Sequence, residues 1–301
     1  MNAATLSNTS STTTARTTAG APGPVRRVLS FLRAHPFLAF SAAVFLLLAV
    51  VSLLAPYVLP DPRALNPVVR LKPPSWTNLF GTDQLGRSVF VRTVYGTRVS
   101  LSIGAAVAIA TTLLGLGIGL FAGFMRRWDG IVMRCMDGIM AIPGVLLAIA
   151  LMSLFGSDIR TVIVAITIPE IPRMARLVRS LTLSIRGQPY IQAAITNGAS
   201  LARLMWRHVL PNVLAPVMVQ ATYVFASAMI LEAVLSFLGA GTPPDIPSWG
   251  NMLAEGRNYL YRAPWMLAFP GVALALLVLL VNVTGDACRD TLDPRLSRSL
   301  K

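Results

Sequence analysis

The sequence predicts an all-α protein that crosses a membrane several times. Hydrophobic residues make up 54% of its 301 residues and charged residues 13%, about half the charged share of a soluble domain. The mean hydropathy is +0.65. Five runs almost free of charge are as long as the roughly 20 residues that cross a bilayer as a helix. These observations together place the chain among polytopic membrane proteins.

The expected membrane spans follow from these runs. In chain order they are 37–59, the run between Arg98 and Arg126, the run between Asp137 and Asp158, 212–238 and 264–285. A sixth and weaker span is 160–178, which contains Pro169, Glu170 and Pro172. Membrane helices tolerate proline where neighbouring helices satisfy the freed backbone groups. We count it as a helix, because an even number of spans places both termini on one side.

The arginines between spans predict the orientation, since short cytoplasmic loops are enriched in basic residues. Arginines follow the second, fourth and last spans and also precede the first one. We therefore expect both termini in the cytoplasm, although the basic residues of the long first outer loop weaken this bias. The expected organisation is a disordered cytoplasmic tail over 1–30, a first span with its outer loop over 31–98, and a core domain over 99–301.

A cytoplasmic segment over 186–211 separates the fourth and fifth spans and contains QAAITNGASLARLMWRHVLP. Its apolar or small positions recur every three or four residues: Ile191, Ile195, Gly198, Ala202 and Met205. This spacing predicts an amphipathic helix with one face to bury. Gly198 lies on that face, where the missing side chain permits close approach of another surface. Packing against the chain's own neighbouring loops is an alternative that the periodicity leaves open.

Several function classes are excluded by missing residues. The only two lysines, Lys72 and Lys301, do not follow glycine, so the chain has no P-loop to bind ATP. Ser200 and His208 lack an acid to orient the histidine, and we interpret them as a surface serine and a helix-end histidine. The two cysteines and two histidines have no metal-binding spacing. The basic residues are scattered, which argues against nucleic-acid binding.

Three ionisable residues fall within or beside the expected spans, and such residues are candidates for function. Glu170 and Asp137 are expected to pair with Arg173 and Arg134 near the interface. Glu232 has no arginine in its own span. It is expected to bond to a neighbouring helix or to line a wet cavity, with ion coupling as the alternative.

Residues 192–211 resemble the EAA loop of permease subunits of ATP-binding cassette importers. That pattern is Glu-Ala-Ala, three residues, Gly, nine residues and Ile-x-Leu-Pro. The chain has Gln192-Ala193-Ala194, then Gly198, then His208-Val209-Leu210-Pro211 at the same spacing. Gln192 and His208 depart from the pattern without changing its register. GTDQLGRSVFVRTVYGTRVSL (81–101), LEAVLSFLGAG (231–241) and PSWGNML (247–253) are similar to the C-type subunits of the dipeptide, oligopeptide and nickel branch.

The resemblance implies the type I importer permease fold with six transmembrane helices and both termini inside. It implies a coupling helix that docks on the ATPase through Gln192, Ala193, Ala194, Gly198, Ser200, Leu201, His208, Leu210 and Pro211. The family motif of the outer segment comprises Gly81, Thr82, Asp83, Gly86 and Arg87. An amphipathic helix over 84–97 and an outer helix around Pro247–Tyr261 are expected with it.

The resemblance also implies the partners and the cargo. A homologous second permease, one or two ATPase subunits and an extracytoplasmic binding protein would complete the importer in a bacterial inner membrane. This chain would bind no cofactor or metal, because ATP and Mg²⁺ belong to the ATPases. Membrane lipid surrounds the chain and no nucleic acid is involved. Peptides are the expected cargo, with glutathione or nickel chelates as alternatives. An ion-coupled secondary transporter fits less well, because the halves show no internal repeat.

Overall fold

The computed structural model describes the backbone of residues 36–292, so the tail expected over 1–30 lies outside the described residues. The chain divides into two units, Met1–Pro36 and Phe37–Lys301, and the elements below make up the second. Every regular element between residues 36 and 292 is helical, and the only β-type pairing there is an isolated bridge between Thr82 and Ser88. The all-α prediction is therefore confirmed for the described part.

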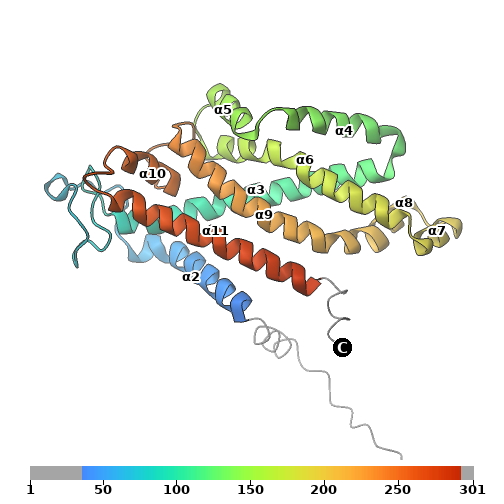
Figure 1. The fold of residues 1–301 in the computed structure, drawn as a ribbon, viewed down its shortest axis with the longest axis horizontal. Helices are drawn as coiled ribbons and strands as arrows, with labels where there is room; N and C mark the ends of the chain where they lie inside the picture. Colours follow the sequence, from blue (N-terminus) through green and yellow to red (C-terminus); the bar gives the residue numbers. More distant parts are fainter. Residues whose placement is uncertain (1–35, 293–301) are drawn as a thin grey trace, which may run out of the picture. The chain divides into compact units, whose positions relative to one another are not determined.

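The long helices carry most of the chain. They are α2 (Pro36–Val58), α3 (Val89–Phe124), α4 (Arg126–Ala141), α5 (Gly144–Phe155), α6 (Ile159–Arg186), α9 (Leu210–Phe237) and α11 (Trp265–Leu292). The short elements are η1 (Pro67–Val69), α7 (Pro189–Thr196), α8 (Leu201–Leu204), the π-helical turn η2 (Met205–Val209) and α10 (Trp249–Arg257). Figure 1 shows α7 and α8 at one end of the bundle and α10 at the other.

Four helical stretches of the described chain are long and apolar enough to cross a membrane. They are Ala39–Val58, Val89–Phe124, Leu201–Phe237 and Trp265–Ala287. Helices α4 and α5 together form a fifth candidate, bent by 84°. The third expected span is thus broken, because Pro143 forces Ile142 into an extended conformation. Helix α6 is 28 residues long, but its arginines keep it out of this group.

Helices α3 and α6 pack most closely, through a stripe of glycines on α3. A Cβ added at Gly119 would lie 2.6 Å from Val178 Cβ, and one at Gly115 would lie 2.5 Å from Met174 Cβ. Small residues at this four-residue spacing let two membrane helices approach until their backbones nearly touch. Helix α9 packs against both helices, so α3, α6 and α9 form the centre of the bundle.

The outer segment differs from the expected amphipathic helix over 84–97. Gly86 has φ +76°, which a helix cannot contain. Ser88 then caps α3 by accepting a hydrogen bond from the Val91 amide. The second half of the expected helix is therefore the first part of α3, which continues without a break to Phe124.

Candidate functional site

The coupling segment, residues 186–211, is a helix–turn–helix and not the single amphipathic helix that the periodicity predicts. Helix α7 ends at Thr196, and Gly198 follows two residues later with a φ of +75°. The Gly198 amide donates to Ile195 O at 2.9 Å and the Ala199 amide donates to Ala194 O at 3.0 Å. This pair of bonds is a Schellman motif, which needs a left-handed residue and therefore favours glycine. Ser200 then caps α8 by accepting from the Arg203 amide.

One face of the coupling segment is buried against the long helices. Ile191, Leu204 and Val209 join a cluster with Met174 and Val178 of α6. This contact agrees with the alternative in which the segment packs on its own chain, but it covers only half of the apolar side chains. Tyr190, Ile195, Leu201 and Trp206 remain exposed, Trp206 to 72%. The segment is thus anchored on one face and presents an apolar surface on the other.

The residues expected to dock on an ATPase lie mostly on this open side. Gln192, Ala193, Gly198, Ser200, Leu201 and Pro211 are exposed, and Ala194, His208 and Leu210 are half-buried. A Cβ added at Gly198 would meet nothing within 4 Å. The close approach expected at Gly198 is therefore not made by the described part of this chain. The Gln192 side chain donates to Arg186 O at 2.9 Å, which ties α7 to the end of α6.

The coupling segment also continues directly into the bundle. Helix α8, η2 and α9 form one uninterrupted helical run, Leu201–Phe237. Within η2 the Leu210 amide donates to Met205 O, one residue further back than in an α-helix. Such π-turns place an extra residue in the helix and often occur at functional sites. Helix α7 is thus bonded to the end of α6, and α8 is continuous with α9.

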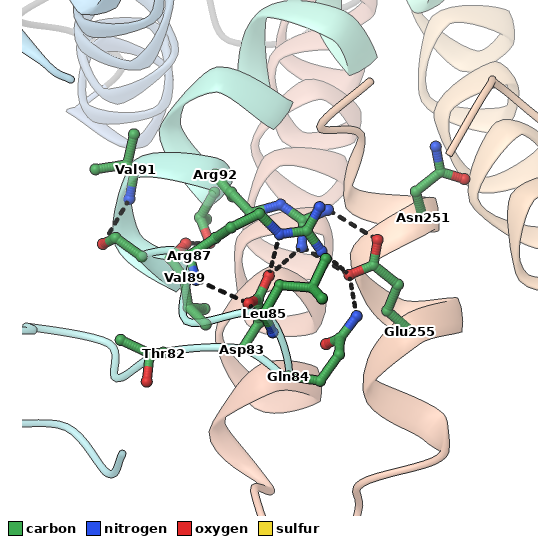
Figure 2. A network of polar contacts seen from close by, with 12 residues as sticks. Thr82, Asp83, Gln84, Leu85, Arg87, Val89, Val91, Arg92, Asn251 and Glu255 are labelled. Atoms are coloured by element: carbon green, nitrogen blue, oxygen red, sulfur yellow. Dashed lines mark hydrogen bonds and ion pairs between the residues drawn. The ribbon is translucent and has the colours of Figure 1, made fainter. Parts of the chain in front are cut away.

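At the opposite end of the bundle, four buried or partly buried charges form a cluster that we call the outer clamp, after the side on which the sequence is expected to place it: Asp83, Arg87, Arg92 and Glu255 (Figure 2). Arg92 donates to Asp83 Oδ2 at 2.8 Å and to Glu255 Oε2 at 2.7 Å. Arg87 donates to the same two carboxylates. Gln84 adds a hydrogen bond to Glu255. The clamp fastens α10 to the start of α3.

The outer motif residues shape the loop that carries the clamp. Asp83 Oδ1 accepts from the amides of Leu85 and Arg87, which holds the turn closed. Thr82 Oγ1 donates to Val69 O and accepts from the Lys72 amide. Close contacts leave no room for a side chain at either glycine: a Cβ at Gly81 would lie 2.7 Å from Trp265 Nε1, and one at Gly86 would lie 1.8 Å from Asn66 O.

The clamp also sets the ionisation of Glu255, which lies outside the membrane spans. Burial acts to raise the pKa of Glu255, but the hydrogen bonds and charge of Arg92, with the charge of Arg87, outweigh it. The pKa of Glu255 therefore lies below its usual value, and the carboxylate is ionised at neutral pH. Motif reasoning missed Glu255 and the role of Arg92. A signal was present, because Glu255 is an acid on the short outer helix of a chain rich in arginine.

The two acidic residues expected in a cavity or between helices lie in different surroundings. Glu170 lines a pocket of about 390 Å³ at the bend between α4 and α5, and pairs with Arg173 at 3.2 Å. Glu232 is fully buried, and its Oε1 accepts from Ser236 and Thr242 at the outer end of α9. Ser236 belongs to α9 itself and Thr242 to the loop 238–248, so neither partner lies on a neighbouring helix.

Asp137 has a different partner from the one expected. It accepts from Arg176 Nη2 of α6 at 2.6 Å, and not from Arg134 of its own helix. Asp129 likewise pairs with Arg179. These contacts tie α4 to α6, because both acids of α4 reach across to the neighbouring helix. Among the described residues no group of three His, Cys, Asp or Glu side chains is placed to hold a metal.

Comparisons with known proteins identify the class. Residues 115–298 match the family described as "Binding-protein-dependent transport system inner membrane component". The chain is 48% identical over 288 residues to the "Probable peptide ABC transporter permease protein y4tQ" of Sinorhizobium fredii, covering 94% of this chain and 99% of the relative. It is 40% identical to the "Di/tripeptide transport system permease protein DppC" of Pseudomonas aeruginosa, covering 88% and 91%.

A solved structure supports the fold. The methionine transporter MetNI in an inward-facing conformation gives a TM-score of 0.55 at 20% identity, covering 70% of this chain and 97% of that chain. The family match and these relatives define a transport permease. The chain belongs to the binding-protein-dependent transport system inner membrane component family, and its relatives are permeases of the peptide branch. It is a multi-pass protein of the inner membrane.

Proposed function

We propose that this chain is the C-type permease subunit of an ATP-binding cassette importer and forms half of the pathway for peptides. The coupling segment is the observation that carries the proposal. It presents exposed apolar side chains on a capped turn that is joined rigidly to α6 and α9. An ATPase bound to this surface would move both helices as one body, which is how a rigid element transmits ligand binding to a distant site.

The proposed topology has six spans with both termini in the cytoplasm. Helices α2, α3, the α4–α5 pair, α6, α9 and α11 would each cross once. Helix α6 is included because it packs against both α3 and α9 and because four of its arginines follow Pro172, towards the coupling segment. Charged side chains within a membrane span generally face protein or water and not lipid.

The energy would come from partner subunits. The chain has no P-loop lysine, so one or two ATPase subunits would bind ATP and Mg²⁺ and dock on the coupling segment. This chain would be non-catalytic and would bind no cofactor. A homologous second permease would complete the pathway, and an extracytoplasmic binding protein would deliver cargo to the end that carries α10. Peptides are the cargo we favour because two relatives are named for them, with glutathione and nickel chelates as alternatives.

The proposal is tested by gentle purification of the chain from its native membranes and mass spectrometry of what accompanies it. One homologous permease and one or two ATPases should copurify, and Gly198→Trp should remove the ATPases while the chain remains inserted. In proteoliposomes, peptide uptake should require ATP and the binding protein. Purification without ATPases, with uptake that follows an ion gradient, would instead identify a secondary transporter.

A further inference from the structure

The pocket at the bend between α4 and α5 is formed by three parts of the chain. Ile142, Pro143 and Gly144 supply the bend itself, which packs on Pro169 of α6. Helix α9 supplies Ile230, Leu231 and Ser227. Apart from Ser227, the polar groups of the lining side chains belong to Glu170 and Arg173 of α6. The pocket thus combines a mainly apolar wall with one pair of charges, as ligand sites commonly do.

The two charges of the pocket differ in their availability. The Glu170 side chain is only 5% exposed, whereas that of Arg173 is 52% exposed. Both hydrogen bonds between them use the same donor, Arg173 Nη1. Among the described residues, nothing accepts from Arg173 Nε or Nη2. Nε and Nη2 together form one edge of the guanidinium group. Such an edge can donate two parallel hydrogen bonds to a carboxylate. Glu170 therefore holds the guanidinium in place, and its free edge remains open to an anion.

We propose that this pocket is a subsite of the transport path that holds the carboxyl-terminal residue of the peptide. Arg173 Nε and Nη2 bind the terminal carboxylate, and Glu170 is the positioning residue that orients the guanidinium. The peptide's last side chain rests on the apolar wall formed by Ile142, Ile230 and Leu231. The inference rests on the proposed function and adds a chemical selectivity to it: the permease itself favours free peptide acids over peptides without a terminal charge.

The test is uptake by the complete importer in proteoliposomes, with trialanine and trialanine amide as the pair of substrates. The affinity of the binding protein for each peptide is measured separately by calorimetry. The binding protein's preference between the acid and the amide is the same for every permease variant. It therefore cancels when the ratios of acid to amide uptake of two variants are compared. Arg173→Gln should lower the ratio of acid to amide uptake about tenfold, since a hydrogen bond to a charged group is worth that much or more.

Arg176→Gln is the matched control. Arg176 lies one turn further along α6, is similarly half exposed and also pairs with a single carboxylate, that of Asp137, but it does not line the pocket. Its ratio of acid to amide uptake should equal that of the wild type. Glu170→Gln should lower the ratio in part, and should lower it no further when Arg173→Gln is already present. Arg173→Lys retains the positive charge but lacks the paired Nε and Nη2 donors, so its ratio of acid to amide uptake should be intermediate. This variant replaces Arg173→Gln if that protein does not assemble.

The outcomes separate the subsite from the proposed function. Equal loss of acid and amide uptake in Arg173→Gln would overturn the subsite, and would mean that the guanidinium pairs with a carboxylate of the second permease. An unchanged ratio would also overturn it. If the wild-type complex takes up neither peptide with ATP and the binding protein, the proposed function fails and not the subsite alone.

Discussion

At the scale of single residues, Gly198 controls the shape of the coupling segment through its backbone. Its φ of +75° costs an L-residue about 1 kcal/mol, while asparagine adopts this conformation more readily. Gly198→Ala should therefore weaken ATPase binding, and Gly198→Asn should retain most of it. Affinity of the purified permease complex for the ATPase measures both. Because a Cβ there meets none of the described residues within 4 Å, equal binding by Gly198→Ala and the wild type would mean that the turn is not part of the docking surface.

Glu232 is the second residue whose role the structure makes testable. Its Oε1 accepts from Ser236 and Thr242, while Oε2 has no partner in the described chain. Glu232→Gln keeps the accepting oxygen, so uptake and thermal stability in nanodiscs should remain close to wild type. Glu232→Leu removes the carboxylate that accepts from the buried Ser236 hydroxyl, while Thr242 keeps Ser248 as an acceptor, and should cost about 1–3 kcal/mol. Abolished uptake by a correctly assembled Glu232→Gln complex would instead indicate proton or ion coupling.

At the scale of elements, the contact between α3 and α6 depends on the glycine stripe. Gly119→Ala places a methyl group 2.6 Å from Val178 Cβ and from Ala175 O. Overpacking of this kind typically costs about 1–3 kcal/mol. The melting temperature of the purified protein should therefore fall. Gly117→Ala is the control, because a Cβ there meets nothing within 4 Å. A similar melting temperature for both variants would show that the two helices are free to separate without cost.

The stabilisation that the outer clamp provides should weaken at acidic pH and not at neutral pH. The pKa of Glu255 is lowered in the folded protein, so its stabilising effect is present above its unfolded value of about 4.3 and is lost as the pH falls further. Hydrogen exchange of α10, corrected for the intrinsic rate, should be constant from pH 8 to 5 and should accelerate below about pH 4. Glu255→Gln should remove this acid-dependent step. An acceleration between pH 7 and 5 would mean that another group opens the clamp.

The elements also show which features the sequence could predict. The apolar runs predicted α2, α3, α9 and α11, because a helix that long and apolar has few alternatives. The turn at Gly198 was missed because helical spacing continues through it. The break at Pro143 was missed because the run remains apolar on both sides.

Contacts between distant residues were the least predictable part of the candidate site. Arg92 and Glu255 are 163 residues apart, and no spacing rule pairs them. Asp137 similarly bonds to Arg176 of another helix, although Arg134 lies nearer in sequence. The motif singled out the residues proposed to dock on the ATPase, but could not indicate which of their side chains would remain exposed after folding.

At the scale of the whole molecule, the proposed orientation can be tested at two positions expected outside and one expected inside. Trp76 lies in the outer segment and is 97% exposed, Ser157 lies in the exposed turn between α5 and α6, and Ile195 is exposed in the coupling segment. We expect single cysteines at Trp76 and Ser157 to react with a membrane-impermeant maleimide in intact spheroplasts. Ile195→Cys should react only after permeabilisation. The background carries Cys135→Ser and Cys288→Ser, so that only the introduced thiol reacts.

This labelling decides the number of spans as well as the orientation. Ser157 and Ile195 lie beyond the two ends of α6, so labelling from opposite sides requires that α6 crosses the membrane despite its arginines. Labelling of both from one side would leave α6 on the surface and would remove the sixth span. Trp76 and Ser157 lie on either side of α3 and the α4–α5 pair, so a shared outer location requires that the bent pair crosses once. Labelling of Ile195→Cys in intact spheroplasts would reverse the orientation and place the coupling segment out of reach of any cytoplasmic ATPase.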